Sequence, residues 1–408
     1  MIKSRYLTLV LLIGHTCSQT SHADILGKTD EERFKQAQSL DMGGIRFYPM
    51  LTTGIGYNDN IYETRDDKRS SMIARVAPQL NFVVPADQHR IDFGLEVNDV
   101  RYQDYSDDNY TDNNAYIALQ AQPGLRHKVS VLLENMVKHA ERGTDLSEGF
   151  NPDTNAIAKD GETIIDAPIE LTDRLANIKY IFGVPNADGH IRLEATKLDR
   201  QYNNFENHTR YFDRDELGGS ATFLWRVLPA TAWAIEGRTK RIEYPNQQTD
   251  VVLDSRENTL LTGFEWDATQ RLSGNFRIGR KQKNFDSPEV DDAAKSTIEF
   301  TGTFKPDELS IFEVNAERNP RETVGTGAFI DAESISASWQ HKWMTRLETK
   351  VEVKGERLEY ANVSRADGIR ALNLGVGYDM RRWLTIRMDA NLHEKTSDEA
   401  AYEYTQNQ

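Results

Sequence analysis

The chain has 408 residues, of which 49 are basic and 64 acidic, and its formal net charge at pH 7 is −15. This acidic balance excludes an ordinary nucleic-acid binder, which needs a basic face for phosphates. Hydrophobic residues make up 38% of the chain, below the roughly 45–50% of a soluble globular domain. Its aromatic content and ordered alternation argue against disorder.

The first 23 residues have the pattern of a secretory signal peptide. Lys3 and Arg5 precede an apolar stretch, residues 6–14, that is too short to span a bilayer. Ser21 and Ala23 place small side chains at the −3 and −1 positions of a cleavage site. We therefore predict a signal peptide over residues 1–23. Its removal leaves 47 basic and 64 acidic residues, a net charge of −17.

The single cysteine, Cys17, lies inside this predicted signal. A lipid anchor on Cys17 is a minor alternative, because Gly14-His15-Thr16 make a poor lipidation site. The predicted mature chain has no cysteine, which excludes disulfides, thiolate nucleophiles and cysteine metal sites. Packing or a closed backbone hydrogen-bond network must hold it together.

Residues 24–44 form a short lead, predicted to be periplasmic, with a helical or irregular segment at 29–40. From residue 45 the dominant period is two, which indicates β-strands. In residues 91–97, apolar Ile, Phe, Leu and Val alternate with Asp, Gly and Glu. Residues 384–392 alternate in the same way. We predict an outer-membrane β-barrel over residues 45–408.

About 17 such segments follow one another, most of them ~10–15 residues long, as strands crossing a bilayer require. The connections between them alternate between very short turns, such as Pro123-Gly124, and long polar loops, such as residues 140–172. This asymmetry is typical of a bacterial outer-membrane barrel and not of a soluble sandwich. The segments therefore predict an all-β, antiparallel, up-and-down transmembrane barrel of about 18 strands.

Aromatic residues near the strand ends predict two interfacial girdles. Trp225, Trp266, Trp343 and Trp383 lie close to the short turns. The tyrosines close to the long loops are Tyr57, Tyr62, Tyr102, Tyr105, Tyr110, Tyr202, Tyr244 and Tyr360.

The end of the chain affects the strand count. Single-chain bacterial barrels have even strand numbers, so that the seam closes antiparallel. Residues 394–401 are polar and predict a last external loop, and residues 402–405 predict the start of an eighteenth strand. We expect this strand to be truncated or missing, so that the natural protein continues or the sequence is a fragment.

A pore would act through the side chains opposite its apolar face, and their mixed signs suit a hydrated glycan better than an anion funnel. The alternative for each residue is that it only solvates and braces the wall. The pore-lining candidates are Arg46, Arg75, Asp92, Glu96, Arg192, Glu194, Arg238, Arg277, Glu299, Glu348, Lys350, Glu352, Lys354, Arg387 and Asp389.

Two loops have a candidate role. Tyr105, Tyr110 and Tyr116 are candidates for stacking on sugar at a loop; the neighbouring aspartates give calcium as a minor alternative and a solvated acidic loop as the simpler interpretation. The longest loop, residues 140–172, is expected to constrict the barrel or cover its mouth.

Catalytic patterns are weak. The histidines are scattered, no Gly-x-Ser-x-Gly motif occurs, and no paired histidines suggest zinc. His341 or His393 beside a serine at 334, 336 or 338 is the hydrolase alternative. We expect no enzyme activity, no metal and no cofactor.

Three segments resemble a known family, putative β-barrel porin 2, from about residue 45 to the end of the chain. They are GIGYNDNIYET (54–64), the proline-containing segment around Ala77-Pro78-Gln79-Leu80, and RYQDYSDDNYTDNNAY (101–116). The resemblance implies an outer-membrane barrel of a Gram-negative bacterium, associated with exopolysaccharide and capsule biosynthesis.

The resemblance supplies no catalytic residues. It implies three partners, namely outer-membrane lipid, a polysaccharide substrate and periplasmic export proteins, and we expect no nucleic acid. Export of exopolysaccharide or capsular polysaccharide is the expected function, with a general diffusion porin or, less favoured, a barrel hydrolase as alternatives.

Overall fold

The computed structural model describes residues 8–13, 39–157, 161–184, 187–247, 252–269, 271–323 and 326–408, the first of these segments by its backbone alone. Within this part of the chain, seventeen strands of 12–16 residues account for most of the fold. They are β3 (Arg46–Asn58), β4 (Ser71–Ala86), β5 (His89–Tyr102), β6 (Tyr110–Gly124), β7 (His127–Ala140), β10 (Ile169–Phe182), β11 (Gly189–Tyr202), β12 (Arg214–Leu228), β13 (Thr231–Glu243), β14 (Ser255–Thr269), β15 (Leu272–Phe285), β16 (Ala293–Phe304), β17 (Ser310–Glu322), β18 (Phe329–Met344), β19 (Leu347–Tyr360), β20 (Ala366–Arg381) and β21 (Leu384–Ser397).

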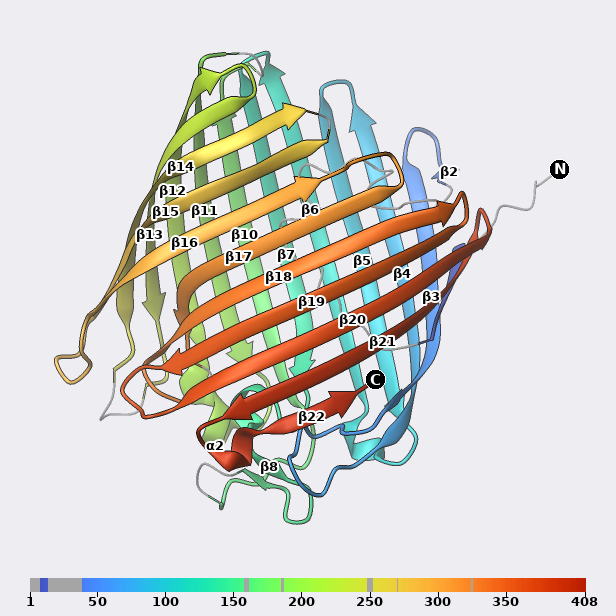
Figure 1. Ribbon diagram of the computed structural model, residues 1–408, viewed down its shortest axis with the longest axis vertical. Coiled ribbons are helices and arrows are strands. Elements are labelled where there is room, and N and C mark those ends of the chain that lie inside the picture. The colour runs from blue at the N-terminus through green and yellow to red at the C-terminus, as the bar shows by residue number, and fades with distance from the viewer. Residues whose placement is uncertain are drawn as a thin grey trace.

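Each of these strands pairs antiparallel with the next, and β7 pairs directly with β10. Figure 1 shows the strands as the wall of a barrel, with β14–β21 crossing in front of β3–β11. The long loops gather at the end that holds β22 (Tyr404–Asn407), and β2 (Leu40–Asp41) lies at the other end. The predicted up-and-down transmembrane barrel is confirmed.

The sheet ends at β3 and β21. The four-residue β22 pairs antiparallel with Leu392–Lys395 of β21, so the expected start of an eighteenth strand is present. Beside it, β1 (Thr8–Ile13) runs parallel to both β3 and β21. The antiparallel meander therefore does not close on itself.

The sequence-based domain boundaries are only partly visible. The backbone of β1 falls inside the predicted signal peptide, and the rest of that segment lies outside the described residues. Most of the lead, with residues 29–38 of its expected helical or irregular segment, also lies outside the described residues, and Leu40 at the end of that segment belongs to β2. The end of the lead, β2, pairs with the start of β3.

Alternation along each strand sorts the side chains onto two faces, because successive residues of a strand point in opposite directions. In β14, Leu260 is 66% exposed on the convex face and its neighbour Leu261 is 1% exposed on the concave face. Phe264 continues the convex face, and Glu257 continues the concave one. An apolar convex surface of this kind is what lipid requires.

The tryptophans and tyrosines occupy different surfaces. Trp225 and Trp343 are about half exposed near the short turns, as predicted for a girdle. The prediction of a second girdle of tyrosines is wrong for six of its eight residues: those at 62, 102, 110, 202, 244 and 360 are all buried. Tyr62, Tyr102, Tyr110 and Tyr202 pack in buried clusters that include loop residues, and Tyr360 packs in a cluster of strand residues.

Two glycines allow the backbones of β14 and β15 to approach closely. A Cβ atom on Gly263 would lie 1.8 Å from the carbonyl oxygen of Phe276, and one on Gly279 would lie 1.8 Å from that of Leu260. By contrast, a Cβ on Gly237 of β13 would meet nothing within 4 Å. Of these three positions, Gly263 and Gly279 therefore exclude a side chain and Gly237 does not.

The remaining elements are short and belong to the connections. They are the helical turns η2 (Ser106–Asp108), η3 (Asp145–Ser147), α2 (Glu206–Thr209), η4 (Arg210–Phe212) and η5 (Ala400–Tyr402), and the small hairpin β8 (Phe150–Asn151) and β9 (Ala156–Ile157). Among the described residues, no helix has the length and apolar character needed to cross a membrane.

Candidate functional site

The concave face carries most of the chain's paired charges. Side chains from strands that are not neighbours meet there: Arg192 of β11 contacts Glu265 of β14 at 2.7 Å. Three strand spacings of about 4.8 Å separate these backbones, so the two side chains meet because the wall curves toward them. The charged face is therefore the inner face.

All fifteen predicted pore-lining residues occupy inward positions of their strands, which are β3, β4, β5, β11, β13, β15, β16, β19 and β21. For example, Glu348 and Arg387 both oppose Gly377 of β20, so they share its face. A role for these residues in permeation remains a prediction.

One network of ion pairs brings four of these residues together across β11–β16. Arg277 is buried and lies 2.5 Å from Glu265, which also binds Arg192. Arg238 donates to Glu236 at 2.6 Å and to Glu299 at 2.5 Å. Positive and negative charges therefore alternate across this wall and largely cancel.

Glu236 and Glu265 in this network were missed by the sequence reasoning. Both lie at inward positions of predicted strands: Glu236 is two residues from Arg238, and Glu265 is two residues from Gly263. The period of two could have found them, but their partners come from other strands.

A second network, nearer the long loops, was missed entirely. Lys283 is 1% exposed and contacts Glu257 at 3.4 Å and Glu322. Lys240 lies 3.2 Å from Glu216. Burying these lysines is tolerable because each has at least one carboxylate partner.

Many ion pairs join residues two apart in one strand, because such residues share a face. Their charged atoms lie 2.5–3.2 Å apart. These pairs are Arg90–Asp92, Arg214–Glu216, Arg238–Glu236, Arg241–Glu243, Lys350–Glu352, Lys354–Glu356, Arg357–Glu359 and Arg387–Asp389.

Three further predicted residues bind neutral side chains. Glu96 accepts from Gln79 at 2.8 Å, and Glu194 accepts from Asn177 at 2.6 Å. Arg75 donates to Asn98 at 2.6 Å.

The long loop after β7 lies across the outer mouth. Glu148 contacts Arg365 at 3.0 Å and Lys395 at 2.5 Å, although these residues are 217 and 247 positions away in the sequence. Asp367 binds the same two cations, at 2.5 and 3.2 Å. We call Glu148, Arg365, Asp367 and Lys395 the mouth latch, because they tie this loop to β20 and β21.

The loop also packs against both sides of the mouth. Phe150 joins a buried cluster with residues of the β3–β4 loop, β4, β5 and β6, and Leu146 joins a second one with residues of β10 and β11. The loop expected at 140–172 therefore covers the mouth. It ends earlier than predicted, since β10 begins at Ile169, whose side chain is buried in the second cluster.

Arg142 anchors this loop at its start. Its guanidinium donates to both carboxylate oxygens of Asp108 at 2.6 Å and to the Tyr62 hydroxyl at 2.9 Å. It also lies over the rings of Tyr62 and Phe150. Arg142 and Asp108 are each 5% exposed, so this ion pair is held away from solvent. Burial and the neighbouring Asp108 raise the pKa of Tyr62.

A group of carboxyls surrounds the loop at the mouth. Burial and repulsion from Glu141 raise the pKa of Glu63 to about 8. Burial likewise raises the pKa of Glu141, and Tyr102 donates to it at 2.9 Å. Across the described part of the chain, no group of three or more His, Cys, Asp or Glu side chains has an arrangement suited to a metal ion.

The three tyrosines proposed for sugar stacking do not form one loop surface. Tyr110 is the first residue of β6, and its buried ring stacks on His139 at 3.4 Å between centroids. Tyr116 lies within β6, not in a loop, and its hydroxyl donates to Asn81. Tyr105 packs on the edge of the Tyr62 ring. The alternation of apolar and polar residues already begins at Tyr110, so Tyr110 and Tyr116 belong to β6 and not to the loop.

The serine–histidine pairing considered for a hydrolase is not formed by His341. His341 lies on the convex face of β18, and the serines at 334, 336 and 338 lie on its concave face, because odd and even residues of a strand point oppositely. His341 instead contacts Ser310 at 2.7 Å. His393 lies on the concave face of β21.

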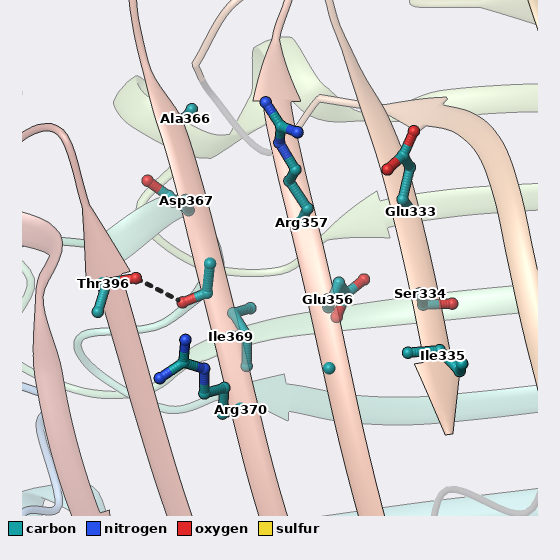
Figure 2. Close-up of a pocket in the computed structure, with 12 residues that line it drawn as sticks. Glu333, Ser334, Ile335, Glu356, Arg357, Ala366, Asp367, Ile369, Arg370 and Thr396 are labelled. Carbon is teal, nitrogen blue, oxygen red and sulfur yellow. Dashed lines mark hydrogen bonds between the residues drawn. The ribbon is translucent and has the colours of Figure 1, made fainter. Parts of the chain in front are cut away.

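A shallow hollow of about 630 Å3 lies on the outer ends of β18–β21. Gly355 and Gly368 expose no side chain on the convex face there, which leaves a gap beside Arg357 and Arg370. Figure 2 shows these arginines on adjacent strands and the hydrogen bond from Thr396 to the carbonyl oxygen of residue 368. Acidic partners, Glu359 and Glu394, compensate both arginines.

The curved antiparallel sheet, its apolar convex face and its charged concave face define an outer-membrane β-barrel of the porin or transporter type. A family model described as putative beta-barrel porin 2 matches residues 36–408. The chain belongs to this family, and it is an outer-membrane protein of a Gram-negative bacterium.

Solved structures agree with this fold. The FrpB iron transporter of Neisseria meningitidis (F3-3 variant) has a TM-score of 0.50 at 11% identity, over 91% of this chain and 64% of that one. The chain thus spans about two thirds of the FrpB length.

Acinetobacter baumannii OccAB3 has a TM-score of 0.47 at 9% identity, over 90% and 98% of the two chains. Pseudomonas aeruginosa OprD has 0.44 at 11%, over 91% and 95%. A search of curated protein sequences finds no match.

Proposed function

We propose that this barrel conducts exopolysaccharide or capsular polysaccharide across the outer membrane, acting as a hydrated channel without bond chemistry. The observation that carries the proposal is the pairing of opposite charges along the concave face, as in the Arg192–Glu265–Arg277 group. A wall of this kind is strongly hydrated but has little net field, which suits a long, neutral or weakly charged chain of hydroxyl groups.

Paired charges would also limit tight binding of the substrate. Conduction requires contacts that are favourable enough for entry yet weak enough for release. An arginine already bound to a carboxylate, such as Arg238 with Glu299 at 2.5 Å, has few donors left for a sugar. The polysaccharide would exchange hydrogen bonds with wall and water as it moves.

The loop across the mouth adds a condition. With Glu148 bound to Arg365 and Lys395, the outer end is partly covered, so passage of a polymer requires this loop to move. Three members of the latch, Arg365, Asp367 and Lys395, are buried, so opening the loop must let water reach their charges as Glu148 moves away. Periplasmic export partners that deliver the polysaccharide are part of the proposal.

The test uses a strain that lacks the gene, complemented with the wild-type protein. The expected result is loss of surface and secreted polysaccharide with glycan building up in the periplasm, and recovery on complementation. Uptake of small solutes should not change.

The other functions give different results. Normal polysaccharide with reduced uptake of small solutes would overturn the proposal and favour a general diffusion porin. Altered glycan chain length, reversed by wild-type protein but not by a His341→Ala or His393→Ala variant, would favour a hydrolase.

A further inference from the structure

The convex face carries a basic patch near the outer ends of β13–β15 that acidic residues compensate only in part. Strand pairing places Arg241 directly opposite Arg256, with Asn284 beyond Arg256. Arg280 lies on the same face of β15, opposite Leu260. We call Arg241, Arg256 and Arg280 the rim patch.

Two members of the patch have no acidic partner among the residues that the structure describes. Arg241 contacts Glu243 at 2.5 Å and approaches Asp286 at 4.0 Å. Arg256 and Arg280 are exposed and make no described ion pair or side-chain hydrogen bond. Like charges directly opposite each other destabilise a strand pair. Arg256 lacks the acidic partner that Arg241 has in Glu243, so it calls for an anion from outside the chain.

The height of the patch fits the outer boundary of the membrane. Arg256 is ten residues along β14 from Trp266, which marks the short-turn end. At about 3.4 Å per residue and a tilt of about 40°, ten residues rise roughly 26 Å, close to the ~25 Å apolar band of such barrels. Arg280 lies lower, and its long side chain can extend up to the same level.

The chemistry around the patch is that of a headgroup site. Thr239, Asn258 and Gln282 lie in one row on the convex face, one step below Arg241 and Arg256, and Thr239 donates to Asn258 at 3.0 Å. Amides and a hydroxyl beside guanidinium groups match the oxygens of a phosphorylated, hydroxyl-rich headgroup. Below this row, Leu260 begins the apolar part of β14, beside Arg280 of β15, and an acyl chain would lie from there downward.

We propose that the rim patch binds the phosphate groups of a glycolipid of the outer leaflet. The inference is independent of which solute passes through the barrel. It rests on the position of Arg241, Arg256 and Arg280 on one face, and on the charges of Arg256 and Arg280, for which the described residues supply no acidic partner.

The outer ends of β18–β21 provide a matched control. Arg370 lies ten residues from Met380 on β20, at a similar height, and faces the same way, but it has a partner in Glu394 at 3.6 Å. Substitution there removes one exposed arginine from a compensated surface. The experiment therefore compares the double variant Arg256→Gln/Arg280→Gln with Arg370→Gln.

The full chain, folded in detergent micelles, would be titrated with purified lipopolysaccharide and, in parallel, with lipopolysaccharide whose phosphates have been removed. Each arginine near such a surface contributes by a factor of about five, so the double variant should bind about thirtyfold more weakly. Arg370→Gln should change binding by less than about twofold. Inorganic phosphate alone should compete only weakly.

Three outcomes would overturn the proposal. The first is equal binding of dephosphorylated lipid to the wild-type protein, an arm that needs no variant to fold. The second is that Arg370→Gln weakens lipopolysaccharide binding as much as the double variant does. The third is a change in oligomeric state of the double variant with unchanged lipid binding, which would make the patch a contact between copies of this chain.

Discussion

Replacing Arg142 by alanine should free the loop over the mouth while leaving the strands intact. Arg142 binds both oxygens of Asp108 and the Tyr62 hydroxyl in a site that is almost completely buried. Removing one member of a buried ion pair costs about 3–5 kcal/mol, since the other charge is left unpaired. Taking ~3 kcal/mol, and a tenfold change per ~1.4 kcal/mol, the open fraction of the loop should rise about a hundredfold.

Limited chymotrypsin digestion of the folded barrel measures this change. Leu146 and Phe150 are buried in the closed loop and become cleavable when it opens. When loop opening is fast relative to cleavage, the rate follows the open population, so it too should rise about a hundredfold. Channel conductance in planar bilayers should increase in parallel.

The controls separate anchoring from general damage. Arg142→Lys keeps the charge but loses the two-oxygen contact, so it should give an intermediate rate. Arg210→Ala removes an exposed arginine whose described side-chain contact is the neighbouring Tyr211 and should change nothing. If Arg142→Ala leaves both cleavage and conductance at wild-type values, Arg142 does not hold the loop.

Three further changes test other parts of the structure. Glu265→Gln removes the carboxylate shared by two arginines, so ion permeation should shift toward anions, measured as the reversal potential in a salt gradient; an unchanged potential would place this network outside the conducting path. The pKa of Glu63 is raised from 4.5 to about 8 in the closed mouth, so the closed mouth holds the proton more tightly than the open one. The closed mouth therefore loses stability relative to the open one as pH rises from about 4.5 to about 8. Conductance should therefore increase between these values and level off above, and Glu63→Gln should flatten the profile, whereas a pH profile identical in both proteins would contradict this role. Gly263→Ala should prevent folding, scored by mobility on gels before and after heating, while Gly237→Ala folds normally; equal folding of the two variants would show that the backbone approach is not required.

The strands could be predicted from sequence because alternation is a local property. Residues 384–392 alternate apolar and polar side chains, and β21 begins at Leu384 and extends to Ser397. The same alternation put Glu299 and Lys350 on the inner face. The outer face must be apolar to contact lipid and the inner face carries the charges, so the sequence predicts both the order of the strands and the face on which each side chain lies.

The mouth could not be predicted in this way, because its contacts join distant segments. Glu148 binds Arg365 and Lys395, more than 200 residues away, and no local pattern marks them as partners. The sequence predicts an interfacial belt that includes Tyr202 and Tyr244, because both lie where a strand meets a loop. Their inward positions became clear only from the burial of their rings.

The ion pairs between residues two apart have a consequence for assembly. In pairs such as Arg90–Asp92 and Arg387–Asp389, both charges belong to one strand. Each such pair cancels two charges before its strand meets its neighbours, so hairpins entering the membrane one after another expose less unbalanced charge to lipid. These pairs do not change when a strand slips, so they stabilise insertion without specifying alignment. Correct alignment must then depend on contacts between strands, such as Arg192 with Glu265.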